Sequence, residues 1–280
     1  MTKQFTIHNL EKLAGIKAHT IRIWERRYKV FEPPRDQTNK RIYDLGHLQK
    51  LLHLALLTRN GNRISRIAVL DPEALAFRVR SVADPAACRE AGVNDLILAG
   101  CVADTEAFES ILTTCVAAWG INSTIRDVIV PYMDRTGLLF YTGTGGAIHF
   151  AVTALRKKLI GGIETVSPAG GMRKTALLFL PKGEHFDLIL LYTAFKLQTD
   201  GLRVLYLGTN VPEESLHEVI LQKKPDYLYT YRHPRQKAAR PYVLPLVGKG
   251  DTIPDYVVVH AHEKMIPETD GRRMVHYRDI

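Results

Sequence analysis

Residues 16–28 read IKAHTIRIWERRY, and this basic segment gives the strongest indication of the structure of the N-terminal part of the chain. Its apolar residues recur at helical spacing and predict a helix over residues 18–28. Ile21 and Trp24 lie on the face that packs inward, whereas the arginines point outward. We therefore expect a core role for Trp24 and a solvent-facing or ligand-facing role for the arginines.

A shorter helix is predicted directly before this one, over residues 6–13. Its apolar residues share one face, and the Thr6 hydroxyl can cap its N-terminus. Gly15 follows, and glycine adopts the left-handed backbone of a tight turn at little cost. Two short helices joined by a glycine turn, the second of them basic, are typical of a helix-turn-helix DNA-binding unit.

Residues 31–43 carry the pattern of a β-hairpin wing. Pro33 and Pro34 exclude a helix, residues 38–40 can form a turn, and Arg41–Tyr43 alternates like a strand. The wing would follow the basic helix directly in the chain. This order predicts a winged helix-turn-helix.

The charge of the chain is concentrated in the same region. Residues 1–66 hold 14 Lys and Arg against 5 Asp and Glu, a surplus equal to the net charge of +9 for the whole chain. The other residues hold 24 basic and 24 acidic side chains, so they are neutral. A basic block on a neutral protein indicates a polyanionic partner, bound by neutralisation of phosphates. The alternative is a solvated basic surface without a partner.

The recognition-helix segment, followed by Arg41–Tyr43 at matching spacing, resembles the MerR family of DNA-binding domains over roughly 70 residues. The resemblance implies a homodimer or higher homo-oligomer on a palindromic double-stranded operator, with RNA polymerase as a further partner. It implies that His19, Thr20 and Arg22 lie near base edges or adjacent phosphates. It also implies a set of mainly phosphate contacts: Arg26, Arg27, Tyr28, Arg35, Lys40, Arg41 and Tyr43.

The rest of the chain changes its pattern twice. A leucine-rich helix is predicted over residues 44–60, and apolar residues then recur at helical spacing from residue 94 to 166. Short apolar strands alternate with helices from residue 176 onward, which predicts a parallel sheet covered on both faces. The predicted units are a winged helix-turn-helix at 1–70, a connector at 71–93, a four-helix bundle at 94–166 and a Rossmann-like (flavodoxin-like) domain at 174–280.

This order of domains resembles the cobalamin-binding photoreceptor subgroup of the family, the CarH/CarA/LitR-like regulators. The subgroup carries a Gly-Glu-x-His-x-x-Gly motif after the first strand, and its histidine binds cobalt. Here the segment begins at Gly183 and Glu184, but Phe186 stands at the histidine position. A phenyl ring has no lone pair to donate, so it cannot ligate cobalt. His185 is one residue away and is a ligand only if the loop is shifted.

Three further marks of the subgroup are also altered. Residues 230–233 replace a Ser-x-Leu, and residues 260–263 replace a Gly-Gly. In the bundle, Phe140 and His149 stand in the region that caps the cofactor, at a shorter spacing than the subgroup has. We therefore expect a regulator with a degenerate sensor and no cofactor, in which Glu184, His185, Phe140 and His149 mark the remnant site. The alternative is a working light sensor that uses adenosylcobalamin.

Other classes of protein find little support in the sequence. No apolar run is long enough to cross a membrane, and three cysteines without metal-ligand spacing suit a reducing cytoplasm. The pair His260 and His262 lacks an evident third ligand, so we expect no metal site. No catalytic constellation is recognisable, so we expect no enzyme. A corrinoid methyltransferase module with a DNA-binding appendage is the remaining enzymatic alternative.

Overall fold

The structure is a computed structural model that describes residues 4–137, 146–166, 174–232 and 255–260. The chain divides into two compact units, Met1–Leu155 and Arg156–Ile280. The first unit is helical and the second contains a parallel sheet. Among the described helices, none combines the length and apolar character that a membrane crossing requires.

The first unit begins with the predicted helix-turn-helix. Helix α1 (Ile7–Ala14) is capped by the Thr6 side chain, and helix α2 (Ala18–Tyr28) has the predicted bounds. Gly15 ends α1 with φ of 64°, a left-handed conformation that favours glycine. The glycine turn between two short helices is thus confirmed.

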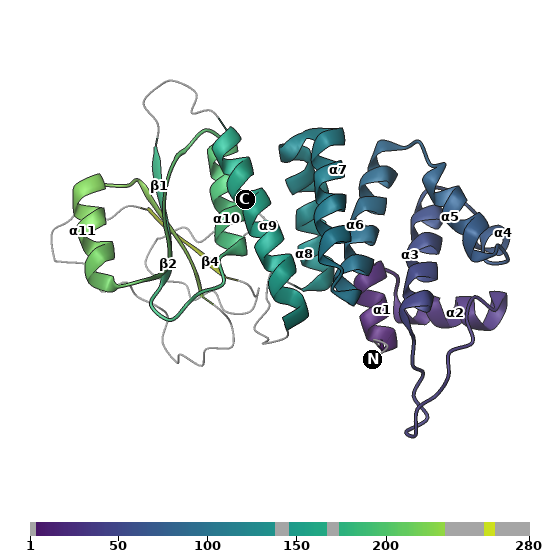
Figure 1. The fold of residues 1–280 in the computed structure, drawn as a ribbon. Coiled ribbons are helices and arrows are strands. Elements are labelled where there is room, and N and C mark those ends of the chain that lie inside the picture. The colour runs from purple at the N-terminus through teal and green to yellow at the C-terminus, as the bar shows by residue number, and fades with distance from the viewer. Residues whose placement is uncertain (1–3, 138–145, 167–173, 233–254, 261–280) are drawn as a thin grey trace. The chain divides into compact units, whose positions relative to one another are not determined.

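The wing that follows α2 is less regular than the predicted hairpin. It projects from the helices in Figure 1 and contains an isolated antiparallel bridge between Arg35 and Arg41. Its base is a second bridge, between Phe5 and Tyr43. Continuous strands do not form because Pro33 and Pro34 have no amide hydrogen to donate.

Helix α3 (Leu45–Arg59) is the centre of the first unit. It contacts α1, α4 (Ile64–Ile67), α5 (Pro72–Arg80) and α6 (Pro85–Val102). Leucines on several sides of α3 are therefore buried, and not only those on one face. Helix α5 and the start of α6 occupy residues 71–93, which the sequence analysis assigned to a connector between the predicted units.

The helices of the predicted bundle region are interrupted. Helix α7 (Thr105–Thr124) bends at Gly120, whose φ of 77° and ψ of 162° are not helical. It continues into a π-helical turn, η1 (Ile125–Ile129), and then α8 (Val130–Thr136). Helix α9 (Gly146–Thr165) follows, and the boundary between the two units falls within it.

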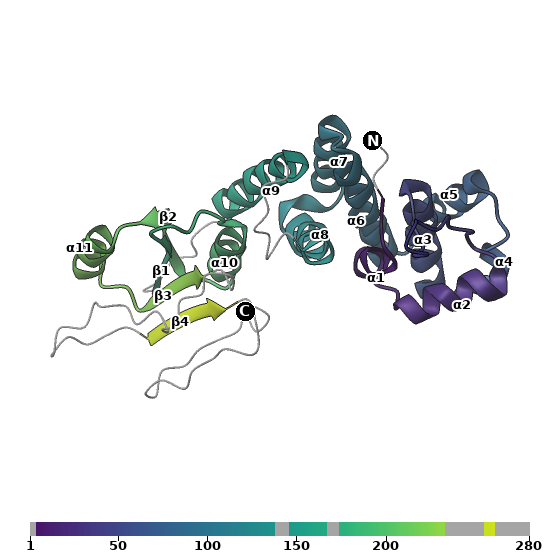
Figure 2. The same ribbon diagram turned by 90° about the horizontal axis from the view of Figure 1, so that it is seen from below.

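The second unit is built on four parallel strands in the order β2-β1-β3-β4. They are β1 (Thr175–Pro181), β2 (Arg203–Val211), β3 (Tyr227–Arg232) and β4 (Asp255–His260). Helices α10 (Leu188–Thr199) and α11 (Glu213–Lys223) lie on opposite faces of the sheet (Figures 1 and 2). This is the predicted doubly wound arrangement. The predicted strand at 273–277 lies outside the described residues.

The strand order places a change of direction between β1 and β3. Leu177 and Phe179 of β1 pack with Leu216 of α11 and Leu228 of β3 in one fully apolar cluster. The chain leaves β1 toward β2 on one side and later returns to β3 on the other. In open parallel sheets, ligands bind beyond the carboxyl ends of the strands at such a point.

Candidate nucleic-acid interface and ligand site

An open hollow between α2 and the wing gathers five of the ten predicted DNA contacts. They are His19, Arg22 and Arg26 from α2, and Arg35 and Arg41 from the wing. On α2 the three residues are three and four positions apart, so they share one helical face. His19, Arg22 and Arg26 are exposed. The hollow therefore presents a strongly cationic surface that a polyanion can reach.

Glu25 holds the wing against α2 from beneath this hollow. It is buried, and its Oε1 accepts a 2.7 Å hydrogen bond from the hydroxyl of Tyr43. Its Oε2 lies 3.4 Å from Nε of Arg41. The Glu25 carboxylate thus holds both Arg41 in the wing and Tyr43 at the base of the wing.

Tyr43 itself is a correction to the predicted set of phosphate contacts. Its side chain is fully buried, and its ring lies edge-on to those of Phe31 and His47. Burial, followed by the hydrogen bond to Glu25, raises the pKa of Tyr43 far above its usual value, so the hydroxyl stays protonated. Tyr43 supports the wing and does not reach a ligand.

The tip of the wing is ordered by its own side chains. Arg35 donates from Nη1 to the carbonyl oxygen of Asn39 at 3.1 Å and to its Oδ1 at 2.9 Å. Oδ1 of Asp36 accepts from the backbone of Thr38 and Lys40. The backbone N–H of Lys40, then the Thr38 hydroxyl, hold the pKa of Asp36 below its usual value. The wing therefore presents its cations on a pre-formed turn.

Besides the buried Tyr43, four predicted contacts lie outside the hollow, namely Thr20, Arg27, Tyr28 and Lys40. Arg27 and Lys40 are exposed, so they stay candidates for phosphates that flank the hollow. Lys29, which the sequence analysis missed, does line it. It ends α2 with φ of 51°, an uncommon left-handed conformation for a lysine. The signal was available, because Lys29 directly follows the basic helix.

The candidate ligand site in the second unit lies in the loop after β1. Asp187 is buried there, and its Oδ1 accepts from Nε and Nη2 of Arg156 at 2.9 and 2.6 Å. Its Oδ2 accepts a 3.1 Å hydrogen bond from the Tyr206 hydroxyl of β2. Burial and Asp187 together raise the pKa of Tyr206. The carboxylate is thus occupied on both oxygens.

The four residues predicted for the remnant cofactor site are only partly described. Glu184 is buried and His185 is exposed, so the two neighbours do not share an environment. His149 is also exposed, in α9. Phe140 lies outside the described residues. The structure therefore places Glu184 and His185 in one loop, where only Glu184 is buried.

Thr230, in the second half of β3, offers a buried polar group. Its hydroxyl oxygen is buried and has no hydrogen-bond partner among the described residues. Thr230 pairs with Phe179 of β1, so it stands where the strand order changes direction. A buried hydroxyl without a partner is costly in an empty site and suits one that hydrogen-bonds a ligand. The sequence analysis noted here only that residues 230–233 replace the Ser-x-Leu of the subgroup.

Comparison with known proteins connects both regions to transcription regulators. Residues 5–73 match the family described as MerR HTH family regulatory protein. The chain is 29% identical to the HTH-type transcriptional repressor CarH of Myxococcus xanthus over 234 residues, 81% of this chain and 78% of that protein. It is 27% identical to the repressor CarA of the same organism over 232 residues, 79% and 73% of the two chains. The chain therefore has a MerR-type helix-turn-helix at its N-terminus and is related to these repressors.

Two solved structures also resemble the chain. One is the methanol:cobalamin methyltransferase complex MtaBC from Methanosarcina barkeri, with a TM-score of 0.28 and 18% identity, covering 61% of this chain and 69% of that one. The other is a cobalamin-binding protein from Desulfitobacterium hafniense DCB-2, with a TM-score of 0.29 and 15% identity, covering 64% and 84%.

The expectation that this chain has no cofactor is contradicted by the relation to CarH. That relation extends over 81% of the chain, well beyond the matched family domain at residues 5–73. The expectation rested on four altered motifs, among them the histidine position that Phe186 occupies. A missing ligand removes one bond to cobalt and leaves the other contacts of a corrinoid ring possible. The unpartnered Thr230 hydroxyl fits such a group, whereas Phe186 does not fit ligation of its metal.

Proposed function

We propose that this chain is a transcriptional regulator that binds a palindromic operator in double-stranded DNA as a homodimer or higher homo-oligomer. The observation that carries the proposal is the convergence of His19, four arginines of the predicted set and Lys29 on one hollow between helix and wing. Such a surface suits a major groove flanked by phosphates. The relation to two repressors supports the regulatory role.

The division of labour follows from the chemistry of the side chains. Arg22 and His19 stand on the exposed face of α2, where a groove-bound helix meets base edges. Arg41 is tied to Glu25, so its position relative to α2 is fixed before DNA arrives. Pre-formed cations lose less side-chain entropy on binding, and they set the register of the protein on the duplex.

We also propose that the second unit binds cobalamin and acts as the sensor of this regulator. The hydroxyl of Thr230 has no partner among the residues that the structure describes, and this favours the role because a polar group of the ligand would satisfy it. Bound adenosylcobalamin would supply a light-sensitive cobalt–carbon bond. Asp187 would keep the loop after β1 in place through Arg156 and Tyr206.

Operator selection with the purified full chain tests the DNA proposal. Random duplexes are selected at two salt concentrations, with and without adenosylcobalamin. We expect a two-fold symmetric site whose affinity falls steeply with salt. Failure to retard any duplex at low salt would overturn the proposal.

Retention of the corrinoid tests the sensor proposal separately. The full chain is mixed with adenosylcobalamin and gel-filtered, and the corrinoid absorption that co-elutes with the protein is measured. We expect retention by the wild type and weaker retention by Thr230→Val, which keeps the shape of the side chain and removes the hydroxyl. Thr153→Val, on the exposed side of α9, is the matched control. Wild-type protein that elutes without corrinoid contradicts the sensor role.

A further inference from the structure

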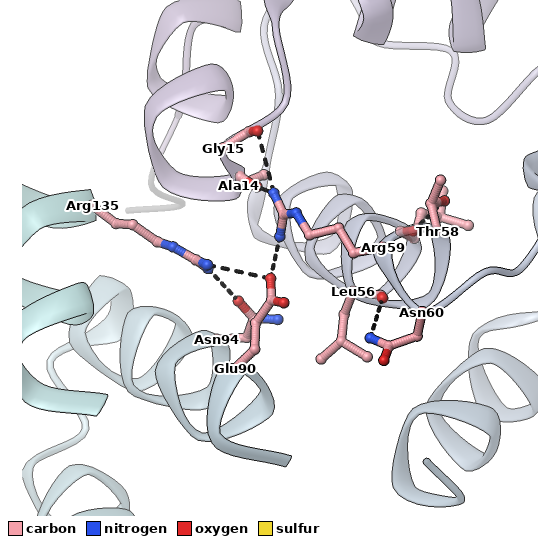
Figure 3. A network of polar contacts seen from close by, with 10 residues as sticks. Ala14, Gly15, Leu56, Thr58, Arg59, Asn60, Glu90, Asn94 and Arg135 are labelled. Carbon is pink, nitrogen blue, oxygen red and sulfur yellow. Dashed lines mark hydrogen bonds and ion pairs between the residues drawn. The ribbon is translucent and has the colours of Figure 1, made fainter. Parts of the chain in front are cut away.

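A polar network within the first unit connects the helix-turn-helix to the bundle (Figure 3). Arg59, the last residue of α3, donates from Nη2 to the carbonyl oxygens of Ala14 at 2.6 Å and Gly15 at 3.2 Å. Its Nη1 pairs with Oε1 of Glu90 in α6. One guanidinium therefore touches both the turn between α1 and α2 and a bundle helix.

Glu90 extends the connection to another bundle helix. The same Oε1 lies 3.3 Å from Nη2 of Arg135 in α8, and Nη1 of Arg135 donates to Oδ1 of Asn94 at 3.0 Å. The Glu90 side chain is 17% exposed, and Asn94 is buried. A single, largely desolvated carboxylate thus holds two arginines from two different helices.

The contact with the turn is close and specific. A Cβ at Gly15 would lie 2.9 Å from Nη2 of Arg59, so the guanidinium lies directly against the glycine. The carbonyl groups at the end of α1 have no partner within the helix, and a cation satisfies them well. Arg59 thereby fixes the path of the chain from α1 into α2. Without Glu90, its partly buried charge would lose its counter-ion.

We infer that Glu90 is a positioning residue for DNA recognition, which acts through Arg59 on the helix-turn-helix and through Arg135 on the bundle. The inference rests on the proposed function. Glu90 lies in the bundle and does not line the cationic hollow. Its effect on DNA is therefore indirect, and a displacement of α6 or α8 changes the support of the turn.

The test compares specific with non-specific DNA binding of the full chain. Glu90→Gln keeps the shape of the side chain and removes its charge. We expect operator affinity to fall about tenfold, within the range typical of coupled sites. Non-specific affinity should stay the same or rise slightly, because the variant has one negative charge fewer. Glu106→Gln, an exposed carboxylate in the first turn of α7, is the matched control and should change neither.

A double-mutant cycle shows whether Glu90 acts through Arg59. In an Arg59→Gln background, Glu90→Gln should change operator affinity less than twofold, because the partner through which it acts is gone. A spectroscopic reporter is available as well, since the chain has only two tryptophans. In a Trp119→Phe background, the emission of Trp24 in α2 should shift on Glu90→Gln and not on Glu106→Gln.

The outcomes separate this inference from the proposed function. Wild type that binds no DNA overturns the proposed function. The role of Glu90 is overturned if the wild type binds the operator and Glu90→Gln binds it with an affinity within twofold of the wild type. An equal loss of affinity for operator and non-specific DNA overturns it as well. If Glu90→Gln is unfolded at the assay temperature, Arg135→Gln replaces it. That variant removes the second partner of the carboxylate, and it should weaken operator binding in the same direction.

Discussion

The hydroxyl of Tyr43 donates a 2.7 Å hydrogen bond to Oε1 of Glu25, which joins the base of the wing to the helix proposed to read DNA. Both side chains are buried, and they stand 18 positions apart in the chain. Glu25 also pairs with Arg41. The position of the wing cations therefore depends on a buried contact within the protein.

Tyr43→Phe should lower both stability and operator affinity. The phenyl ring fills the same space, but Oε1 of Glu25 loses its donor in a buried site. Such a loss costs about 1–3 kcal/mol. The wing would also lose part of its anchor, so operator binding should weaken. Thermal unfolding and operator titration measure the two effects. Tyr28→Phe, at the end of α2, is the control for the effect on stability alone, and equal stability of the two variants contradicts the prediction.

The cationic hollow predicts different effects for two basic residues. Arg22→Ala should weaken operator binding by about 1–3 kcal/mol if Arg22 contacts a base edge, and should relax preference at that position. Lys40→Ala should weaken all duplexes about equally and reduce the dependence on salt. Arg203→Ala removes the same charge in the second unit and should change neither quantity. Unchanged DNA binding by both Arg22→Ala and Lys40→Ala would show that the DNA surface lies elsewhere.

Asp44 predicts a pH-dependent contribution to the stability of α3. The backbone N–H of His47, donating to Oδ1 of Asp44 at 2.9 Å, is the main cause that lowers the pKa of this carboxyl. A lowered folded pKa stabilises the protein above the unfolded pKa of about 3.9, and the gain is lost as pH falls through the folded value. Asp44→Ala should therefore cost about 1 kcal/mol near neutral pH and less below about pH 4.

Thermal melts between pH 7 and pH 3 measure this dependence. Asp44→Asn keeps an acceptor that does not titrate, so its stability relative to Asp44→Ala should be nearly constant across that range. A deficit of Asp44→Ala that grows as the pH falls has the wrong sign for this explanation.

The approach of α6 to α8 depends on the absence of a side chain at Gly100. A Cβ there would lie 2.8 Å from the hydroxyl of Tyr132, which is buried against Phe108 with ring centroids 5.3 Å apart. Gly100→Ala should therefore destabilise the protein by about 1–3 kcal/mol. Gly161 in α9 has no atom within 4 Å of its added Cβ, so Gly161→Ala should stabilise by about 0.5–1 kcal/mol. Denaturant unfolding of the two variants should shift in opposite directions.

Cys115 should resist alkylation in the folded protein. Burial, and then the nearby charge of Asp95, raises the pKa of the Cys115 thiol to about 11. At pH 8 roughly one thiol in a thousand is then ionised, and the thiolate is the reactive form. Cys88 and Cys101 are less buried and should react first with iodoacetamide. Peptide mass spectrometry of partially labelled protein gives the order of labelling, which should disappear in denaturant.

Local patterns predicted the elements whose signals are strong. The bounds of α2 were predicted correctly because its apolar spacing is regular and Gly15 and Pro33 flank it. Helix α5 and the first part of α6, before residue 94, were missed, and each helix begins at a proline, Pro72 or Pro85. Both prolines stand at the first position of a helix, where no amide hydrogen is needed, and Asp71 and Asp84 cap them. A proline directly after an aspartate indicates a helix start as readily as a loop.

The positive charge of the candidate DNA site could be predicted from the sequence, whereas the contacts within the two candidate sites could not. The cationic side chains of α2 could be placed on one face from their spacing alone. The inward direction of Tyr43 could not, because it depends on pairing with Phe5, far away in the sequence. The unpartnered hydroxyl of Thr230 likewise exists only once β3 is packed beside β1. Pairings over long sequence separations leave no trace in local periodicity.

The conformation of Lys29 implies a compromise, at the end of α2, between an unstrained backbone and positive charge in the hollow. A left-handed backbone costs a residue other than glycine roughly 1 kcal/mol, and glycine would end α2 without that strain. Glycine would also remove one cation from the hollow. Selection for thermal robustness alone should therefore replace this lysine, whereas selection for a tight grip on DNA should retain it. The residue found at this position in engineered or evolved variants would report which of the two demands had prevailed.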